Sequence, residues 1–350
     1  MNEPAPEKPP RRPRYSGNNP RHFQEKYKEH QPDKYPEDVS RVIASGKTPA
    51  GTHRPILVAE IMAVLAPQPG EVAVDCTLGY GGHARELIKA VQPGGRLIAV
   101  DVDSQQLTKT EARLRQLGFP DDSITIRHTN FAGIASLIAA EYPAGVDVVL
   151  ADLGVSSMQI DDPERGFTYK FDGPLDMRLN PARGQMAAAL LSKIDSQSLA
   201  KLLELNADEP HAIKLADYIL KAQADFPLKT TTDLANVVTN FMKEKTRGTS
   251  DVAKDTVRRV FQALRIAVND EFGALDAFLR NLPYCLKSKG RVAILSFHSG
   301  EDRRVKKAFK QGLSEGVFSS ISEEIIRPSP DEQHANPRSR SAKLRFAVRS

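Results

Sequence analysis

The chain has 350 residues, of which 40% are hydrophobic and 27% charged, and its formal net charge is +5. This composition is typical of a globular protein, and no apolar run is long enough to span a bilayer, so we expect no membrane partner. The start, MNEPAPEKPPRRPRYSG, lacks the apolar core of a secretory signal. Cysteines occur only at Cys76 and Cys285, which argues against a disulfide framework and for a cytoplasmic protein.

The first part of the chain, residues 1–47, is rich in Pro, Arg, Lys and Asn and has no hydrophobic period. Such a segment buries too little apolar surface to offset the entropy of ordering, so we predict a disordered basic extension. The alternative is a basic arm that contacts RNA phosphates.

The next segment alternates between helical and strand patterns. HRPILVAEIMAVLAP has apolar residues at helical spacing and ends at prolines. Amphipathic helices then separate short apolar runs, which predicts a parallel α/β sheet that is covered on both faces. The predicted strands are residues 71–76, 96–103, 123–128, 146–153 and 291–298, with a last, antiparallel edge strand over 343–349.

This alternation stops after Leu153. Residues 163–260 contain several short helical patterns and no good strand, which predicts a helical insertion in the sheet domain. The run VFQALRIAVNDEFGALDAFLRNL, residues 260–282, is predicted to be one helix that resumes the α/β pattern. The sheet domain therefore comprises residues 48–162 and 261–350.

A glycine-rich turn follows the first predicted strand. Residues 79–84, GYGGHA, match the pattern G-x-G-x-x-G/A between a strand and a helix, and Asp101 ends the next strand. Glycines let a ligand approach the backbone, and a carboxylate at that position accepts ribose hydroxyls, so the context indicates a nucleotide-type cofactor. A tight turn without a ligand is the alternative.

Two cofactor classes compete for this turn. Asp75 precedes the glycines, and a carboxylate there would repel the pyrophosphate of NAD. S-adenosylmethionine has a sulfonium, an ammonium and no phosphate, so Asp75 and Asp101 favour it. An NAD-dependent oxidoreductase stays the alternative from another enzyme class.

Polar residues also follow the fourth and fifth predicted strands. Asp152 and Gln159 lie in ADLGVSSMQIDDPERGFTYKFDGPLDMR, and His298 lies in SFHSGEDRRVKK. Ligands of open parallel sheets bind at the carboxyl ends of the strands, although Asp152 alone also suits a turn or a helix cap. Two basic clusters follow, and they suit a phosphate backbone or a solvated face. No metal-binding spacing occurs, so we expect no metal.

Seven blocks together carry a family resemblance: HRPILVAEIM, VDCTLGYGGHARELI, DVDSQQL, VVLADLGVSSMQIDDPERGFTYKFDGPLDMR, VFQALRIAVNDE, GRVAILSFHSGEDRRVK and NPRSRSAKLRFAVR. They span residues 53–349 and resemble the bacterial 16S ribosomal RNA (cytosine-N4)-methyltransferases, the MraW or RsmH family. The resemblance implies a class I, Rossmann-like methyltransferase sheet with a helical insertion that recognises substrate. It implies methyl transfer from S-adenosylmethionine to N4 of a cytidine in the decoding region of the small subunit.

The resemblance also implies site residues. The donor would contact Gly81, Gly82 and His83, Asp101 would hold the ribose, Phe131 would lie by the adenine, and Asp152 and Gln159 would complete the site. The residue pattern adds Asp75 and Gly79 to the predicted donor site. We predict that Asp152 accepts hydrogen bonds from the cytosine amine, and His298 is a second catalytic candidate. Predicted RNA contacts are Arg165, Phe167, Tyr169, Arg178, Arg303, Arg304, Lys306, Arg338 and Arg340.

Two positions depart from the family pattern. Gly300 stands where leucine is usual, and DTVRR replaces HPATR, so that only Arg259 of that run is kept. The second change puts nearby RNA contacts in doubt. A non-catalytic RNA-binding factor with this fold is a further alternative, and a homodimer is left open.

Overall fold

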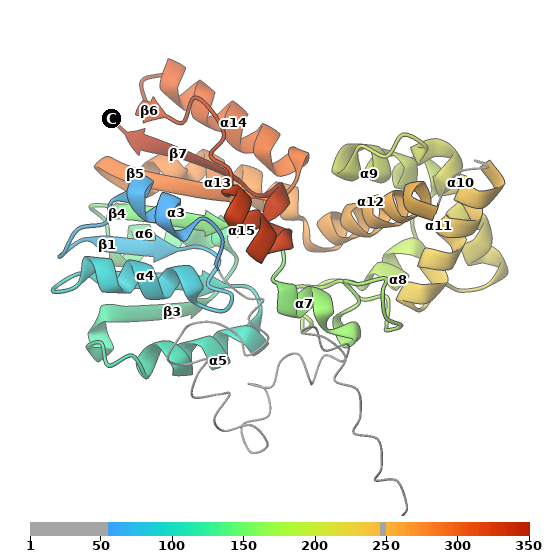
Figure 1. Ribbon diagram of the computed structural model, residues 1–350, viewed down its shortest axis with the longest axis horizontal. Coiled ribbons are helices and arrows are strands. Elements are labelled where there is room, and N and C mark those ends of the chain that lie inside the picture. The colour runs from blue at the N-terminus through green and yellow to red at the C-terminus, as the bar shows by residue number, and fades with distance from the viewer. Residues whose placement is uncertain (1–54, 246–249) are drawn as a thin grey trace, which may run out of the picture. The chain divides into compact units, whose positions relative to one another are not determined.

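The computed structural model describes residues 55–245 and 250–350, which form a sheet with helices on both faces and a separate group of helices (Figure 1). The predicted disordered extension over residues 1–47 lies outside the described residues.

The sheet has seven strands in the order β3-β2-β1-β4-β5-β7-β6. Strands β1 to β5 pair in parallel, whereas β7 is antiparallel to both β5 and β6. The parallel order 3-2-1-4-5 is that of a Rossmann-like doubly wound sheet, so the predicted fold class is confirmed. The strands are Val72–Asp75 (β1), Arg96–Asp101 (β2), Ile124–His128 (β3), Val146–Asp152 (β4), Leu286–Ser296 (β5), Phe318–Ile321 (β6) and Lys343–Arg349 (β7).

Three strands differ from the prediction. Strand β7 is antiparallel, as predicted, but it is not the edge strand, because it lies between β5 and β6. Strand β5 was predicted over residues 291–298 but starts at Leu286. Leu286 pairs with Val146 of β4, and an irregularity in the register separates this pair from the rest of the ladder. Strand β6 was not predicted, since FSSI is short and lacks a clear apolar alternation. Its pairing with β7 at the sheet edge stabilises it.

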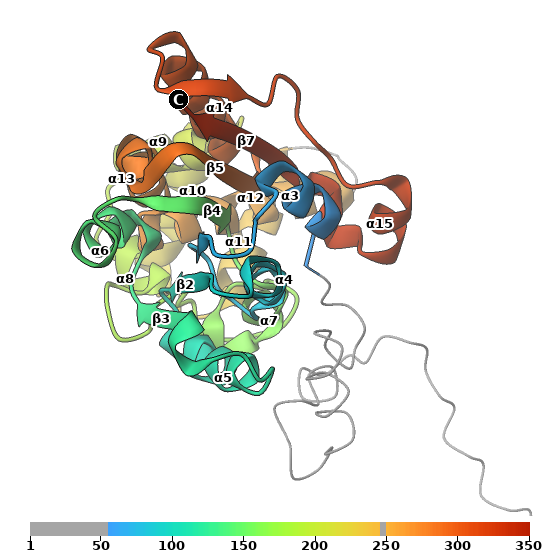
Figure 2. The same cartoon turned by 90° about the vertical axis from the view of Figure 1, so that its left-hand side faces the viewer.

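Two groups of helices cover opposite faces of the sheet, and Figure 2 shows α4 and α6 on opposite sides. One apolar cluster packs α3 to α5 on the sheet, with Ile61, Leu87 and Leu114 among its buried members. The second packs α6, α13 and α14, with Ile138, Phe278 and Phe309. These helices are Val58–Leu65 (α3), Gly82–Val91 (α4), Ser104–Arg115 (α5), Ile134–Glu141 (α6), Glu271–Cys285 (α13) and Ser299–Ser314 (α14).

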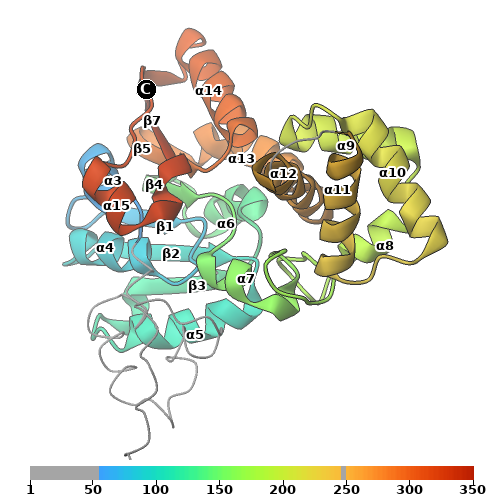
Figure 3. The ribbon, with the colours of Figure 1, turned by 45° about the vertical axis from the view of Figure 1, so that its right-hand side comes forward.

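The remaining longer helices form their own cluster, and Figure 3 shows them beside the sheet. Leu203, Leu215 and Phe241 are among its buried residues. The helices are Ala187–Leu191 (α8), Ser196–Ala207 (α9), Ala212–Asp225 (α10), Thr231–Lys245 (α11) and Ser250–Asn269 (α12), and short helices lie at Ser157–Asp161 (α7) and Pro330–Ala335 (α15). Within the two described ranges, no helix combines the length and apolar character that a membrane span requires.

The single helix predicted over residues 260–282 is two helices. Asp270 has a left-handed backbone with φ 47°, which ends α12 and starts α13. Helix α12 runs through position 260, and Phe261 and Leu264 pack with the insertion helices. The division after residue 260 therefore falls inside a helix, and the domain limits stay a prediction.

Candidate active site

The turn between β1 and α4 has glycine where the backbone requires it. Gly79 and Gly81 have φ angles of 45° and 78°, in the left-handed region that glycine adopts without strain. A Cβ atom at Gly81 would lie 2.8 Å from Cγ2 of Thr110 on α5, so the turn packs tightly against that helix. Helix α4 begins at Gly82 without a side-chain cap, and such a helix start suits a polar ligand.

The Asp101 carboxylate, at the end of β2, lies directly beside this turn. Its Oδ2 accepts a hydrogen bond from the Gly79 backbone N–H at 2.7 Å, and its Oδ1 accepts one from the Asp103 N–H at 2.8 Å. Burial raises the pKa of Asp101, and these hydrogen bonds oppose the rise. A carboxylate has lone pairs beyond these two contacts, so Asp101 retains acceptor capacity for ribose hydroxyls.

A buried imidazole and two carboxylates meet at the carboxyl ends of β1 and β4. His83 Nε2 lies 3.5 Å from Asp152 Oδ2. The Asp152 N–H donates to Thr77 Oγ1 at 2.6 Å, and Thr77 N–H donates to Asp75 Oδ1 at 3.0 Å. The hydroxyl and backbone of Thr77 therefore join the two strand ends.

Burial controls the titration of this group. It raises the pKa of Asp75, which is only 1% exposed, to about 6. Burial lowers the pKa of His83, but the contact with Asp152 and the nearby carboxylates outweigh burial and raise it overall. Within the described part of the chain, His83 Nε2 and Asp152 Oδ1 are buried and have no hydrogen-bond partner. Buried polar atoms without a hydrogen bond are rare in native proteins, and a polar ligand at the carboxyl ends of β1 and β4 would account for these two.

Phe131 and Gln159, the other two predicted donor contacts, make different interactions within the protein. Phe131 is partly buried, and its ring packs edge-on against Phe278 with centroids 5.5 Å apart. Gln159 is buried, and its side chain accepts from Ser156 N–H and donates to Asp103 Oδ2, each at 2.8 Å. Gln159 thus completes a capping box on α7, and a donor contact from it stays a prediction.

Asp103 is a residue that the sequence analysis missed. Its buried carboxylate starts α5 by accepting from the N–H groups of Gln105 and Gln106, and it binds Arg165 Nη1 at 2.7 Å. The sequence did contain a signal for this role. Asp103 stands directly before an amphipathic helical pattern, which is the position of a typical N-cap.

Most residues predicted to contact RNA in the loop after α7 make internal contacts. Arg165 binds Asp103, and Arg178 forms two hydrogen bonds with Asp176 at 2.6 and 2.8 Å. Phe167 is 9% exposed within the insertion cluster, and Tyr169 packs edge-on against Phe261. In their described conformation these four side chains shape the loop.

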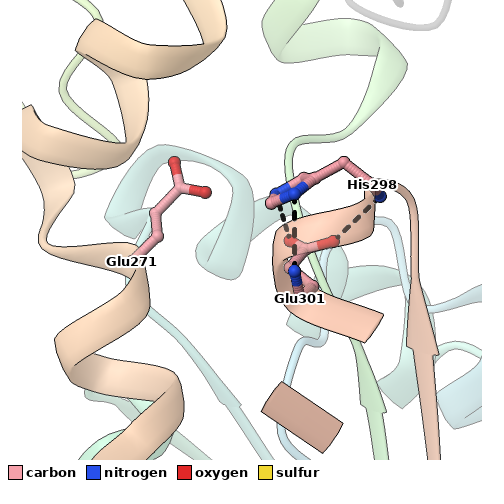
Figure 4. A group of neighbouring side chains, drawn as sticks. All are labelled: Glu271, His298 and Glu301. Carbon is pink, nitrogen blue, oxygen red and sulfur yellow. Dashed lines mark hydrogen bonds and ion pairs between the residues drawn. The ribbon is translucent and has the colours of Figure 1, made fainter. Parts of the chain in front are cut away.

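His298 caps α14 and interacts with Glu301 of the same helix, as Figure 4 shows. Its Nδ1 accepts from Glu301 N–H at 3.4 Å, and its Nε2 lies 3.2 Å from Glu301 Oε1. Glu271 is close by, and ligand atoms of the three residues lie within 4.8 Å of one another.

Such a group of three is also a candidate metal centre. Both oxygens of Glu271, however, accept from Arg265 at 2.8 Å. Glu301 Oε2 accepts from Phe297 N–H at 2.9 Å, and the hydrogen bond with His298 is the largest of the interactions that lower the pKa of Glu301 against the upward effect of burial. Arg265, the Phe297 N–H and the Glu301 N–H therefore already engage these ligand atoms, and the group fits an internal hydrogen-bond and ion-pair network better than a cation site.

The predicted basic clusters are largely paired with acidic residues. Arg303 binds Asp208 at 3.1 Å, Arg304 lies 3.3 Å from Asp276 and stacks on Phe272, and Arg338 binds Asp161 at 2.7 Å. Among these predicted RNA contacts, Lys306 and Arg340 are exposed, and Arg303 is exposed although it is paired with Asp208.

Comparisons with known proteins agree with the sequence motifs. The family model of the MraW methylase family matches residues 50–350. The chain is 49% identical over 348 residues to "Ribosomal RNA small subunit methyltransferase H 2" of Alkaliphilus metalliredigens, covering 98% of this chain and 99% of the relative. It is 46% identical over 342 residues to "Ribosomal RNA small subunit methyltransferase H 1" of Lachnoclostridium phytofermentans, covering 97% and 93%. A solved structure of a putative rRNA-methylase from Clostridium thermocellum matches with a TM-score of 0.40 and 12% identity over 85% of this chain and 100% of that chain.

The chain belongs to the MraW methylase family. The resemblance inferred from the motifs is confirmed, the chain is a methyltransferase, and its methyl donor is S-adenosylmethionine, as predicted. The alternative of an NAD-dependent oxidoreductase is therefore wrong.

The residues at the β1–α4 turn fit the donor of a MraW methylase. Gly81 lets the turn pack closely against Thr110 of α5, and Asp101 has acceptor capacity beside the turn. The buried carboxylate of Asp75 and the partly buried carboxylate of Asp152 can supply negative charge for a ligand with an ammonium and a sulfonium.

Proposed function

We propose that this methyltransferase methylates the exocyclic N4 of a cytidine in the decoding region of 16S ribosomal RNA, in the small ribosomal subunit. Two relatives that cover nearly the whole chain are named as small-subunit ribosomal RNA methyltransferases. The resemblance of the seven sequence blocks supports the cytosine N4 position.

The observation that carries the proposal is the buried, unpaired Oδ1 of Asp152 at the carboxyl end of β4, beside the glycine turn. A cytosine amine is a weak nucleophile, because its lone pair is delocalised into the ring. A fixed acceptor for its N–H hydrogen localises that lone pair as the new bond forms. Asp152 supplies such an acceptor next to the donor turn.

S-adenosylmethionine supplies a methyl group activated by the positive sulfur. Asp152 Oδ1 accepts a hydrogen bond from the N4 amine and holds it in line, and the carboxylate takes the proton that the amine loses as the N–C bond forms. His83 steadies the carboxylate from 3.5 Å away. We assign the ribose to Asp101 and the amino-acid end of the donor to the surroundings of Asp75, His83 and Gly81.

The target base must leave its stack to reach the donor. Phe167, Tyr169 and Phe171 are the aromatic candidates for stacking on it. Phe171 is 44% exposed, whereas Phe167 is 9% exposed and Tyr169 packs on Phe261. Exposure favours Phe171 as the stacking residue, with Lys306 and Arg340 as phosphate contacts.

Mass spectrometry of nucleosides from small-subunit RNA tests the proposal. RNA from cells that lack the gene should lose N4-methylcytidine at one position, and the wild-type gene should restore it. Asp152→Asn should not restore it. The matched control is Asp147→Asn, at the opposite end of β4, where Lys287 and the Val72 N–H bind the carboxylate. A lost methyl group on another atom or another RNA would refute the proposal, and restoration by Asp152→Asn would refute the catalytic role of Asp152.

A further inference from the structure

Arg165 connects the donor side of the site with the loop over residues 163–180. Its Nη1 donates to Asp103 Oδ2 at 2.7 Å, and its Nη2 donates to the carbonyl oxygens of Arg178 and Leu179 at 3.2 and 3.0 Å. The side chain is 11% exposed and that of Asp103 is 1% exposed. The guanidinium of Arg165 therefore connects Asp103, at the start of α5, with the backbone of residues 178 and 179.

On the donor side, the position of Asp103 depends on Asp101. The Asp101 carboxylate accepts from both the Asp103 N–H and the Gly79 N–H. Asp103 in turn starts α5, the helix whose Thr110 packs on Gly81 and donates to the Gly79 carbonyl oxygen at 2.6 Å. The glycine turn and Asp101 are thus joined by hydrogen bonds to the residue whose carboxylate holds Arg165.

On the loop side, the backbone is strained at the point where Arg165 binds. Met177 is fully buried and has a left-handed φ of 64°, which a residue with a side chain rarely adopts. Its N–H donates to the Arg165 carbonyl oxygen at 3.1 Å, and its own carbonyl oxygen accepts from Asn269 Nδ2 at 2.8 Å. The Leu179 N–H donates to Asn269 Oδ1 at 2.7 Å. Arg165 and Asn269 together hold this conformation.

A buried ion pair is in itself weak evidence for stability, because desolvation offsets the attraction. The planar fork of arginine is nevertheless required to bind one carboxylate and two carbonyl groups at once, and lysine cannot reproduce it. A continuous path of hydrogen bonds therefore runs from Gly79 through Asp101, Asp103 and Arg165 to the strained loop.

We propose that Arg165 is a positioning residue that couples donor binding to the loop over residues 163–180, so that donor and RNA bind with positive cooperativity. This inference rests on the proposed function, because RNA is the second ligand. Coupling is reciprocal, so each ligand tightens the binding of the other by the same factor.

The experiment measures binding of the full chain to small ribosomal subunits from cells that lack the enzyme, with and without saturating S-adenosylhomocysteine. For the wild type, we expect saturating S-adenosylhomocysteine to increase the affinity for the subunit by about fivefold or more. For Arg165→Lys, this factor should fall to about one, while the affinity for S-adenosylhomocysteine alone changes less than about threefold. The control is Arg183→Lys, an exposed arginine that follows the same loop, which should keep the wild-type factor.

Asp103→Asn provides a second variant that disturbs the same link from the donor side. It should lower the coupling factor as well, and the double variant should lose no more than Arg165→Lys alone, because both changes break one link. Thermal unfolding of each variant verifies that it is folded. A wild-type factor of one, or an unchanged factor in Arg165→Lys, would overturn the coupling alone. Absence of subunit binding by the wild type would refute the proposed function and the coupling with it.

Discussion

The imidazole of His83 and the carboxylate of Asp152 meet at 3.5 Å, so the first turn of α4 and the end of β4 converge on one point. Both side chains contain a buried atom that has no hydrogen-bond partner among the described residues. A buried polar atom that makes no hydrogen bond, such as Asp152 Oδ1, costs free energy on folding. This arrangement is therefore expected to serve ligand binding and chemistry more than folding.

Replacing Asp152 should separate chemistry from donor binding. In Asp152→Asn, the amide is a weaker acceptor and cannot take a proton, so kcat should fall by about 100-fold or more. The dissociation constant of S-adenosylhomocysteine should change less than about threefold. Single-turnover methylation and calorimetry measure the two quantities. The control Asp147→Asn should keep kcat near the wild-type value, and an unchanged kcat in Asp152→Asn would remove Asp152 from the catalytic step.

Donor binding should weaken in mild acid. Burial raises the pKa of Asp75 from 3.8 to about 6, and protonation below that pH removes a negative charge from the donor site. At pH 5, the dissociation constant of S-adenosylmethionine should be about tenfold higher than at pH 7.5. Calorimetry across this range measures the change.

The control is Asp75→Asn, in which the dissociation constant of S-adenosylmethionine should depend much less on pH. A residual slope is expected from Asp101, whose pKa burial also raises. Because the folded protein binds the Asp75 proton more tightly than the unfolded chain does, the contribution of this group to stability increases as the pH falls from about 6 toward 3.8. A profile that is identical in the wild type and Asp75→Asn would contradict the assignment.

The glycine turn allows a test with a matched control. Gly81 and Gly118 have nearly the same φ, 78° and 76°, but a Cβ atom meets Thr110 only at Gly81 and meets nothing within 4 Å at Gly118. Gly118→Ala should cost about 1 kcal/mol of stability through backbone strain and leave donor affinity unchanged. Gly81→Ala should cost more and should weaken S-adenosylhomocysteine binding by about tenfold or more, because the turn must shift. Equal effects of the two variants on donor affinity would show that Gly81 has no role in the site.

Local patterns were enough to predict the parallel strands of the sheet and the glycine turn after β1. Strand β1, the glycines and the start of α4 follow one another in the sequence, and Asp101 follows from the end of the next strand. Their arrangement depends on hydrophobic alternation and on backbone conformations that glycine favours. The break at Asp270 was missed because an aspartate with a left-handed backbone leaves the apolar period on both sides intact.

The partners of charged residues were not predictable in the same way. Arg165 and Asp103 are 62 positions apart, and Arg303 and Asp208 are 95 positions apart. An arginine in a polar segment has the same sequence pattern whether it binds RNA or a distant carboxylate. Only tertiary packing decides between these roles.

Arg259 illustrates this point, because it is the arginine retained from the altered family run. Its Nε binds Glu209 Oε2 at 2.6 Å, and the Glu209 side chain is completely buried. Arg259→Met would leave that carboxylate buried without a countercharge, so the free energy of unfolding should fall by about 3 kcal/mol.

Urea unfolding measures this cost against a neighbouring control. Arg258 forms an exposed ion pair with Asp255, and Arg258→Met should cost less than about 0.5 kcal/mol. The double variant Glu209→Gln, Arg259→Met should recover part of the lost stability, since it removes the buried charge. A double variant less stable than Arg259→Met would show that Glu209 does not depend on Arg259.

The salt dependence of RNA binding tests the exposed basic residues. If Lys306 on α14 contacts a phosphate, the logarithm of the subunit association constant should fall linearly with the logarithm of salt concentration. The slope should become shallower by about 0.7 to 0.9 in Lys306→Ala, because one fewer counterion is released. The control is Lys89→Ala, an exposed lysine in the last turn of α4, which is at the opposite end of that helix from the glycine turn. Because the predicted contact is specific to the α14 surface, an equal change in both variants, or no salt dependence in the wild type, would exclude Lys306 from the RNA interface.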